Sequence, residues 1–191
     1  MNIRVGDLHL VGHLCYNDEV RGENRMSKKQ KEEFNSLVQD IVDNKRFNKL
    51  NTELHHGITR YEHSMRVARW TYKVCNFLKM KNKNDVTRAA LLHDFYINED
   101  LVSERGSSKL GEHPTVALEN SKKYFKISNM QADIIKTHMF PCNFDIPKYK
   151  ESWLVSGIDK AVSTYEMLRF KSPLYAGIYV LFLFEMIRLP R

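Results

Sequence analysis

Histidine and aspartate residues recur in this chain inside short apolar segments, and both are residue types that bind metal ions. The segments are YEHSMRVA, LLHDF, GEHPTVAL, IIKTHMFP and VSGIDKAV, which contain His63, His93, Asp94, His113, His138 and Asp159. A single histidine on an apolar face is usually a hydrogen-bonded core residue. Burying several imidazoles and two carboxylates together costs free energy, however, and a bound ion removes that cost. The set as a whole therefore predicts a metal centre.

The mixture of ligand types indicates which ions and which reaction to expect. Imidazoles combined with carboxylates suit Fe, Mn, Co, Ni or Zn, whereas Mg prefers more oxygen ligands. Two such ions, about 3.5–4 Å apart, can share a hydroxide and hold a phosphoryl oxygen. Hydrolysis at such a centre uses a metal-bound hydroxide and needs no serine or cysteine nucleophile.

The segments that carry these residues have a helical period. Apolar residues recur at spacings of three and four from Ser27 onwards, and no strand network is visible. The expected fold is all-α, with residues 97–112 as a polar loop before a helix that starts at Pro114. The first helix is expected to begin near Ser27. The later helices are expected at about 59–79, 84–94, 114–125, 128–139, 151–170 and 173–188.

Each candidate ligand is expected on an inward helix face. His63 shares a face with Val67, Trp70, Val74 and Phe77. His93 follows Val86 and Ala90, His138 follows Ile134 and Ile135, and Asp159 lies between Val155 and Val162. We therefore expect one domain, residues 26–191, with its motif-bearing core at 52–168, while residues 1–25 give no clear pattern.

The last expected helix, 173–188, contains the most apolar stretch of the chain. Residues 174–184 read LYAGIYVLFLF, and eleven residues make about 16 Å of helix, against about 30 Å of hydrocarbon in a bilayer. We therefore do not expect a membrane span. We expect a buried helix, and the alternative is a contact with a membrane surface or with another copy in a homo-oligomer.

The charge and the cysteine content indicate which partners and which cellular compartment to expect. Thirty basic and 23 acidic residues give a net charge of +7, which favours small anionic partners such as phosphate esters. The basic residues form short clusters typical of solvated helix faces, so nucleic-acid binding is not favoured. Cys15, Cys75 and Cys142 are widely spaced, which argues against a disulfide framework and, with no signal pattern, predicts a cytoplasmic protein.

The ordered series of motifs resembles the HD superfamily of metal-dependent hydrolases, which is named for its adjacent His-Asp pair. The resemblance covers residues 52–168 and is strongest to small bacterial HD-domain hydrolases with HHG, YEHS, LLHDF, HP, HMFP and DK elements. It implies an HD-domain helical bundle with the metal site at its centre. The adjacent His-Asp pair alone would be weak evidence, and its position between an EHS histidine and a later Asp-Lys makes it more specific.

The resemblance also implies roles for individual residues. In that superfamily one ion is bound by residues that correspond here to His63, His93, Asp94 and Asp159. Members with two further histidines, here His113 and His138, bind a second ion, and the aspartate of the pair bridges both. Asp94 is thus expected to be a catalytic residue and a shared ligand of a binuclear centre, with Fe or Mn favoured over Co, Ni or Zn.

This chain departs from the pattern of several HD phosphodiesterases at one position. They carry a lysine three residues after the aspartate of the pair, and here that residue is Ile97. Replacement cations that adjoin the site are Lys160 and Arg60, with Arg105 and Lys109 as further candidates in the loop. For each of these residues the alternative to a role at the phosphate is a structural ion pair. His55 and His56 are interpreted as helix-end or loop residues, with the mouth of the site as the alternative.

The leading hypothesis from the sequence is a phosphohydrolase that acts on a nucleotide or another small phosphate ester. Two alternatives stay open. One is a mixed-valent di-iron oxygenase of the HD fold, because the same six ligands serve both kinds of enzyme. The other is a non-catalytic, nucleotide-binding HD domain.

Overall fold

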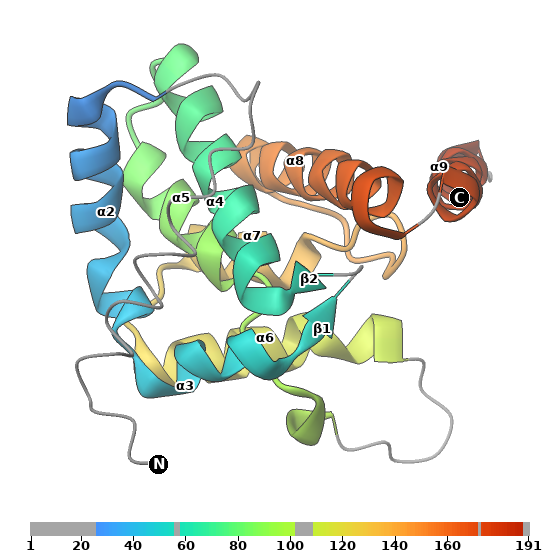
Figure 1. Cartoon of the computed structure of the whole chain (residues 1–191), viewed down its shortest axis with the longest axis horizontal. Helices are drawn as coiled ribbons and strands as arrows, with labels where there is room; N and C mark the ends of the chain where they lie inside the picture. The colour runs from blue at the N-terminus through green and yellow to red at the C-terminus, as the bar shows by residue number, and fades with distance from the viewer. Residues whose placement is uncertain (1–25, 56–57, 102–108, 172, 189–191) are drawn as a thin grey trace, which may run out of the picture.

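The computed structural model describes residues 26–55, 58–101, 109–171 and 173–188, and in this part of the chain the fold is all-α, as predicted (Figure 1). Residues 1–25 lie outside it. The α-helices are α2 (Lys28–Val42), α3 (Lys45–Asn48), α4 (Arg60–Phe77), α5 (Lys83–Leu92), α6 (Lys109–Tyr124), α7 (Asn129–Thr137), α8 (Lys150–Glu166) and α9 (Pro173–Arg188). The minor elements are the 3₁₀ turns η1 (Lys49–Thr52) and η2 (Asn98–Asp100), the π-helical segment η3 (Met167–Lys171) and an antiparallel pair of two-residue strands, β1 (Leu54–His55) and β2 (Ile58–Thr59).

Three helices begin at residues whose side chains cap the free backbone N–H groups. The side chains of Ser27, Thr59 and Ser128 each accept a hydrogen bond from the backbone N–H of the third residue of α2, α4 and α7. The side chain of that third residue in turn accepts a hydrogen bond from the backbone N–H of the capping residue. Such a capping box satisfies two backbone donors that the helix itself leaves unpaired. The starts of these helices match the sequence prediction for this reason.

The start of α6 differs from the prediction. The helix begins at Lys109, so Pro114 and His113 lie inside it, whereas we expected His113 to precede a helix starting at Pro114. Proline already has a helical φ, and near a helix start its missing N–H removes a single hydrogen bond. His113 therefore projects from a regular helix.

The centre of the molecule is formed by α4, α5, α7 and α8, which contact one another, with α6 packed on α7. The inward faces predicted for α5, α7 and α8 are confirmed. The apolar residues that define these faces are at most 5% exposed: Val86, Ala90, Ile134, Ile135, Val155 and Val162. On α4 the prediction is wrong at the far end, because Phe77 is 84% exposed. At that end the buried face of α4 contains Tyr72 and Cys75, both fully buried, so Phe77 lies on a face that points away from the core.

Helix α9 has the predicted bounds, but the prediction that it is buried is wrong. It lies at the side of the bundle beyond the end of α8 (Figure 1), and it contacts mainly α8 and η3. Leu181 is 66% and Phe184 is 58% exposed. The apolar sequence selects a helix, whereas burial requires a second surface to pack against.

None of the described helices is long and apolar enough to cross a membrane.

Candidate metal centre

All six predicted ligands meet at the centre of the bundle. His63 comes from α4, His113 from α6 and Asp159 from α8. His93 is the C-cap of α5 and His138 the C-cap of α7, so both follow directly on the helix ends. Each of the six residues is at most 6% exposed: His63, His93, Asp94, His113, His138 and Asp159. Residues up to 96 positions apart in the sequence thus form one buried polar cluster.

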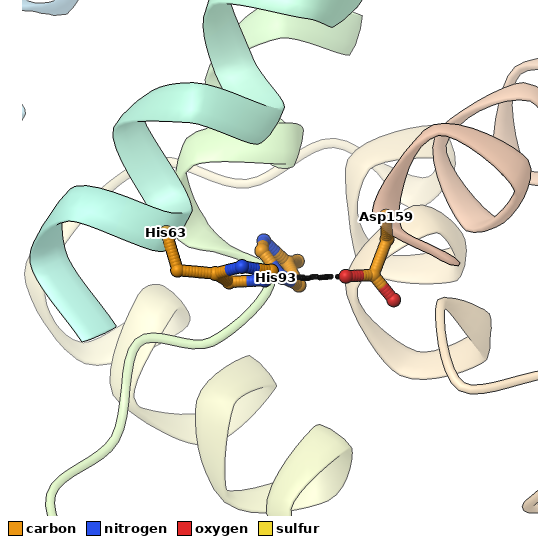
Figure 2. Close-up of side chains that lie close together, drawn as sticks. All are labelled: His63, His93 and Asp159. Atoms are coloured by element: carbon orange, nitrogen blue, oxygen red, sulfur yellow. Dashed lines mark hydrogen bonds and ion pairs between the residues drawn. The ribbon is translucent and has the colours of Figure 1, made fainter. Parts of the chain in front are cut away.

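Three of these residues form the first group, which we call the His63 cluster: His63, His93 and Asp159. Figure 2 shows the two imidazoles and the carboxylate converging from α4, from the end of α5 and from α8. Asp159 Oδ1 lies 3.2 Å from His63 Nε2 and 3.6 Å from His93 Nε2. The three ligand atoms therefore surround one point.

The second group, the His113 cluster, consists of His113 and His138 beside Asp94. Asp94 Oδ1 lies 3.5 Å from the Nε2 atoms of both histidines, and these two nitrogens are 3.2 Å apart. Three ligand atoms again surround one point.

Asp94 connects the two clusters through different oxygens. Its Oδ1 faces His113 and His138, while its Oδ2 lies 3.7 Å from His93 Nε2 in the His63 cluster. A carboxylate arranged in this way has one oxygen for each of two ions. This geometry fits the bridging role implied by the sequence.

The spacing of the ligand atoms fits metal ions. Atoms about 2.1 Å from an ion lie about 3.0 Å apart in octahedral and about 3.4 Å apart in tetrahedral geometry. The distances within the clusters, 3.2–3.7 Å, are close to these values. The Nε2 atom of His93 is also buried without a hydrogen-bond partner, which is costly unless an ion binds it. The donor set and its geometry therefore suit a divalent transition metal.

The opposite ring nitrogens are held by hydrogen bonds. His93 Nδ1 lies 2.7 Å from the carbonyl oxygen of Ala90, and His138 Nδ1 lies 2.7 Å from that of Ile135. A carbonyl only accepts, so each Nδ1 carries the proton and donates it, which leaves Nε2 with its lone pair facing the cluster. Both imidazoles are thus in the tautomer that binds a metal.

His63 is held differently, by a residue that the sequence analysis missed. Its Nδ1 lies 2.7 Å from Oε2 of Glu166, the last residue of α8, and Arg66 pairs with Oε1 of the same carboxylate. Glu166 is fully buried. The one available signal was its spacing, because seven residues from Asp159 place it on the same face of α8.

The electrostatics of the cluster favour ionised carboxylates. Burial raises the pKa of Asp94, but the imidazoles of His93, His138 and His113 outweigh it and hold that pKa well below its usual range. Burial likewise opposes the ionisation of Asp159, but the hydrogen bond with His63 and the nearby imidazole of His93 lower its pKa well below the usual value. Burial lowers the pKa of His63, yet Asp159 and Glu166 together raise it to about 10. Both carboxylates are therefore charged at neutral pH.

Lys160, one of the two cations predicted to act in catalysis, lies beside the His63 cluster. Its Nζ donates a hydrogen bond of 2.6 Å to the carbonyl oxygen of His138 and lies 3.6 Å from Asp159 Oδ2. The side chain is 13% exposed. The ammonium group is thus within reach of both the ligand set and the solvent.

Arg60, the other predicted cation, is only 4% exposed and is held by neighbouring groups. It donates to the carbonyl oxygen of Tyr96 at 3.0 Å, pairs with Glu53, and its guanidinium carbon lies 3.9 Å from the centroid of the Tyr96 ring. That ring lies 5.1 Å, centroid to centroid, from His113. The contacts favour a role for Arg60 in holding Tyr96 against His113.

Position 97, where several phosphodiesterases carry lysine, is part of the apolar core. Ile97 is 4% exposed and packs in the main hydrophobic cluster.

Helix α9 borders the site through Tyr179, which the sequence analysis also missed. Burial raises the pKa of the Tyr179 hydroxyl, and the nearby carboxylates of Asp159 and Asp94 raise it further. The half-buried face of this exposed helix is therefore the one that faces the cluster.

The remaining predicted residues fall outside the described part of the chain. Arg105 and His56 are not described, nor are the side chains of Lys109, at the start of α6, and His55, in β1.

Comparison with known proteins identifies one family. A family model described as HD domain matches residues 60–161, which is more than half of the chain. No curated protein and no solved structure matches. The matched region includes every residue of both clusters.

Proposed function

Because this chain belongs to the HD domain family, whose members are typically metal-dependent hydrolases, we propose that it is a phosphohydrolase with a binuclear metal centre. His63, His93, Asp159 and Asp94 would hold one ion, and His113, His138 and Asp94 would hold the other. The observation that carries the proposal is the division of the two Asp94 oxygens between two sets of ligand atoms.

The protein's own groups prepare this site in three ways. The backbone carbonyls behind His93 and His138 fix the tautomers, burial excludes water from the ligands, and Asp94 and Asp159 supply negative charge. Fe or Mn is the favoured metal, with Co, Ni and Zn as alternatives for the same ligand types. When bound, the ions supply Lewis acidity and an activated water at neutral pH.

The proposed substrate is a nucleotide or another small phosphate ester. Lys160 is the cation best placed to meet a phosphoryl oxygen, since its Nζ lies beside Asp159 and the side chain reaches solvent. The net charge of +7 favours anionic substrates generally. Arg60 contributes indirectly, through Tyr96 and His113.

The free thiols of Cys75 and Cys142 agree with a cytoplasmic location.

The test combines metal content with turnover. Protein prepared anaerobically without a histidine tag should contain about two equivalents of Fe or Mn, and Asp94→Ala should contain none. A panel of phosphomonoesters, cyclic nucleotides and dinucleoside polyphosphates, assayed with Mn, Fe and Co, should show turnover that Asp94→Ala lacks. Lys160→Met should raise KM more than it lowers kcat. Two bound ions with no turnover on any ester would contradict the phosphohydrolase assignment.

The same preparation separates the two alternatives. A mixed-valent di-iron oxygenase would give an EPR signal from a half-oxidised iron pair and consume oxygen. A non-catalytic domain would be stabilised thermally by a nucleotide without forming product.

A further inference from the structure

The two clusters differ in what stands behind their histidines. The Nδ1 atoms of His93 and His138 meet neutral backbone carbonyls, each three residues earlier in the chain. The Nδ1 of His63 meets the Glu166 carboxylate. An anionic acceptor behind an imidazole makes it a stronger ligand than a carbonyl does, because it stabilises positive charge that the ring acquires from the metal.

Helix α8 supplies both carboxylates that contact His63. Asp159 and Glu166 are seven residues apart, two helical turns, and they lie 3.2 Å and 2.7 Å from opposite nitrogens of the same ring. On α4, Arg66 follows His63 by three residues and so lies on the same face, where it pairs with Glu166. The pairing places a positive charge beside the fully buried Glu166 carboxylate, which offsets the cost of burying it.

The two clusters also differ in the number of carboxylates that they contain. The His63 cluster contains Asp159 and shares Asp94, whereas the His113 cluster has the shared Asp94 as its one carboxylate. The Glu166 charge is paired with Arg66, and Lys160 lies 3.6 Å from Asp159. Glu166 therefore favours an ion beside His63 through its hydrogen bond to Nδ1 rather than through net charge.

We propose that Glu166 is a positioning residue that makes the His63 cluster the tighter of the two metal sites, so that the first ion binds there and the second binds at the His113 cluster. The inference rests on the proposed metal centre and deepens it. Glu166 acts through His63, by keeping its proton on Nδ1 and its Nε2 lone pair directed at the ion.

The substitution Glu166→Gln tests this role with nearly unchanged volume. The Arg66 guanidinium can only donate, so it attracts the oxygen of the new amide and leaves the NH₂ group facing His63 Nδ1. An NH₂ donor can be met only by an unprotonated Nδ1, which places the ring proton on Nε2 and blocks the metal. The variant should therefore weaken the first binding step and spare the second.

The matched control is Glu151→Gln. Glu151 is also a buried glutamate on α8, it binds Asn82 at 2.7 Å, and fifteen residues place it about 22 Å along the helix from Glu166. Loss of a carboxylate from α8 is thus the same in both variants, and only the contact with His63 differs.

The measurement is a titration of the metal-free protein with Zn²⁺ against a competing chelator. Wild type and Glu151→Gln should bind two ions in two steps, and Glu166→Gln should lose about 10- to 100-fold in the first step only. His138→Ala should keep the first step and lose the second. Nitrogen NMR of the Zn²⁺-loaded wild type should show the His63 proton on Nδ1, and circular dichroism should show that Glu166→Gln keeps its helices.

Three results would overturn the inference: an unchanged first step in Glu166→Gln, an equal loss in both steps, or loss of the first step in His138→Ala. In each of these the wild type still binds two ions, so the proposed metal centre stands. A wild type that binds no ion at all would overturn the metal centre and the inference together.

Discussion

Helices α5 and α9 are both rich in apolar residues, yet the bundle buries one and leaves much of the other exposed. In α5, Val86, Ala90 and Leu91 are fully buried. In α9, the stretch from Pro173 to Phe184 has no charged residue, and Leu181 is 66% exposed. Composition alone would rank α9 as the more deeply buried helix.

The difference lies in what surrounds each helix. Helix α5 is covered by α4 and α7 and ends on His93 and Asp94, whose side chains meet ligands from four other segments. Helix α9 follows the π-helical segment η3 and packs mainly along that segment and α8. Apolar residues thus determine that a helix forms, and neighbouring helices determine whether it is buried.

The largest expected effect is on stability, and it compares one leucine from each helix. Leu91→Ala should lower the free energy of unfolding by about 2–5 kcal/mol, because it removes a fully buried side chain and leaves a cavity. Leu181→Ala should change it by no more than about 0.5 kcal/mol. Urea unfolding of both variants measures this, and a large loss in Leu181→Ala would show that α9 is covered in solution.

Metal binding should stabilise the bundle and act independently of α9. Mn²⁺ or Zn²⁺ at 100 times its dissociation constant adds about 2.7 kcal/mol per site, which corresponds to a Tm increase of roughly 5–10 °C. Thermal melts with metal and with a chelator measure the increase. Asp94→Ala, which removes the residue common to both clusters, should abolish the increase and Leu181→Ala should keep it, whereas an increase in Asp94→Ala would place the stabilising ion elsewhere.

In the metal-free protein, stability should fall as pH rises. Burial opposes the charged form of His63, but Asp159 and Glu166 raise its pKa from 6.5 to about 10. A raised pKa contributes stability that is complete below pH 6.5 and is lost as the pH approaches 10, at no more than about 1.4 kcal/mol per pH unit. Urea unfolding in the presence of chelator between pH 6.5 and 10 should show this slope, and His63→Gln should flatten it. An equal slope in both proteins would assign it to another group.

The smallest effects are expected on the exposed face of α9. Ile178→Ser should leave the metal content unchanged and shift Tm by no more than about 2 °C, because Ile178 is 55% exposed. Tyr179→Ser, on the half-buried face beside the cluster, should shift Tm further. Metal analysis and thermal melts of the pair measure the contrast, and equal shifts would show that the two faces of α9 are equivalent.

The sequence was sufficient to find the candidate ligands, because each one occurs within a local apolar pattern. His138 after Ile134 and Ile135, and Asp159 between Val155 and Val162, are examples in which residue type and helical period agree. The structure brings these residues together as expected.

Glu166 was not predictable in the same way. In the sequence it is a lone glutamate near a helix end, a pattern typical of solvated charge. Its burial depends on His63 and Arg66, which are about a hundred residues away in the chain. The exposure of α9 was missed because it depends on how the helices pack. The early start of α6 was missed because it depends on a proline that the helix tolerates.

The contact between His63 and Glu166 spans 103 residues, and that separation has a consequence for the making of the protein. At about 5–20 residues per second, roughly 5–20 s pass between the synthesis of the two residues. For nearly all of that interval His63 has neither carboxylate partner, because Asp159 also comes from α8, 96 residues after His63. The His63 cluster is therefore assembled late, after α4 to α7 have been synthesised, and metal capture by the complete cluster follows the docking of α8.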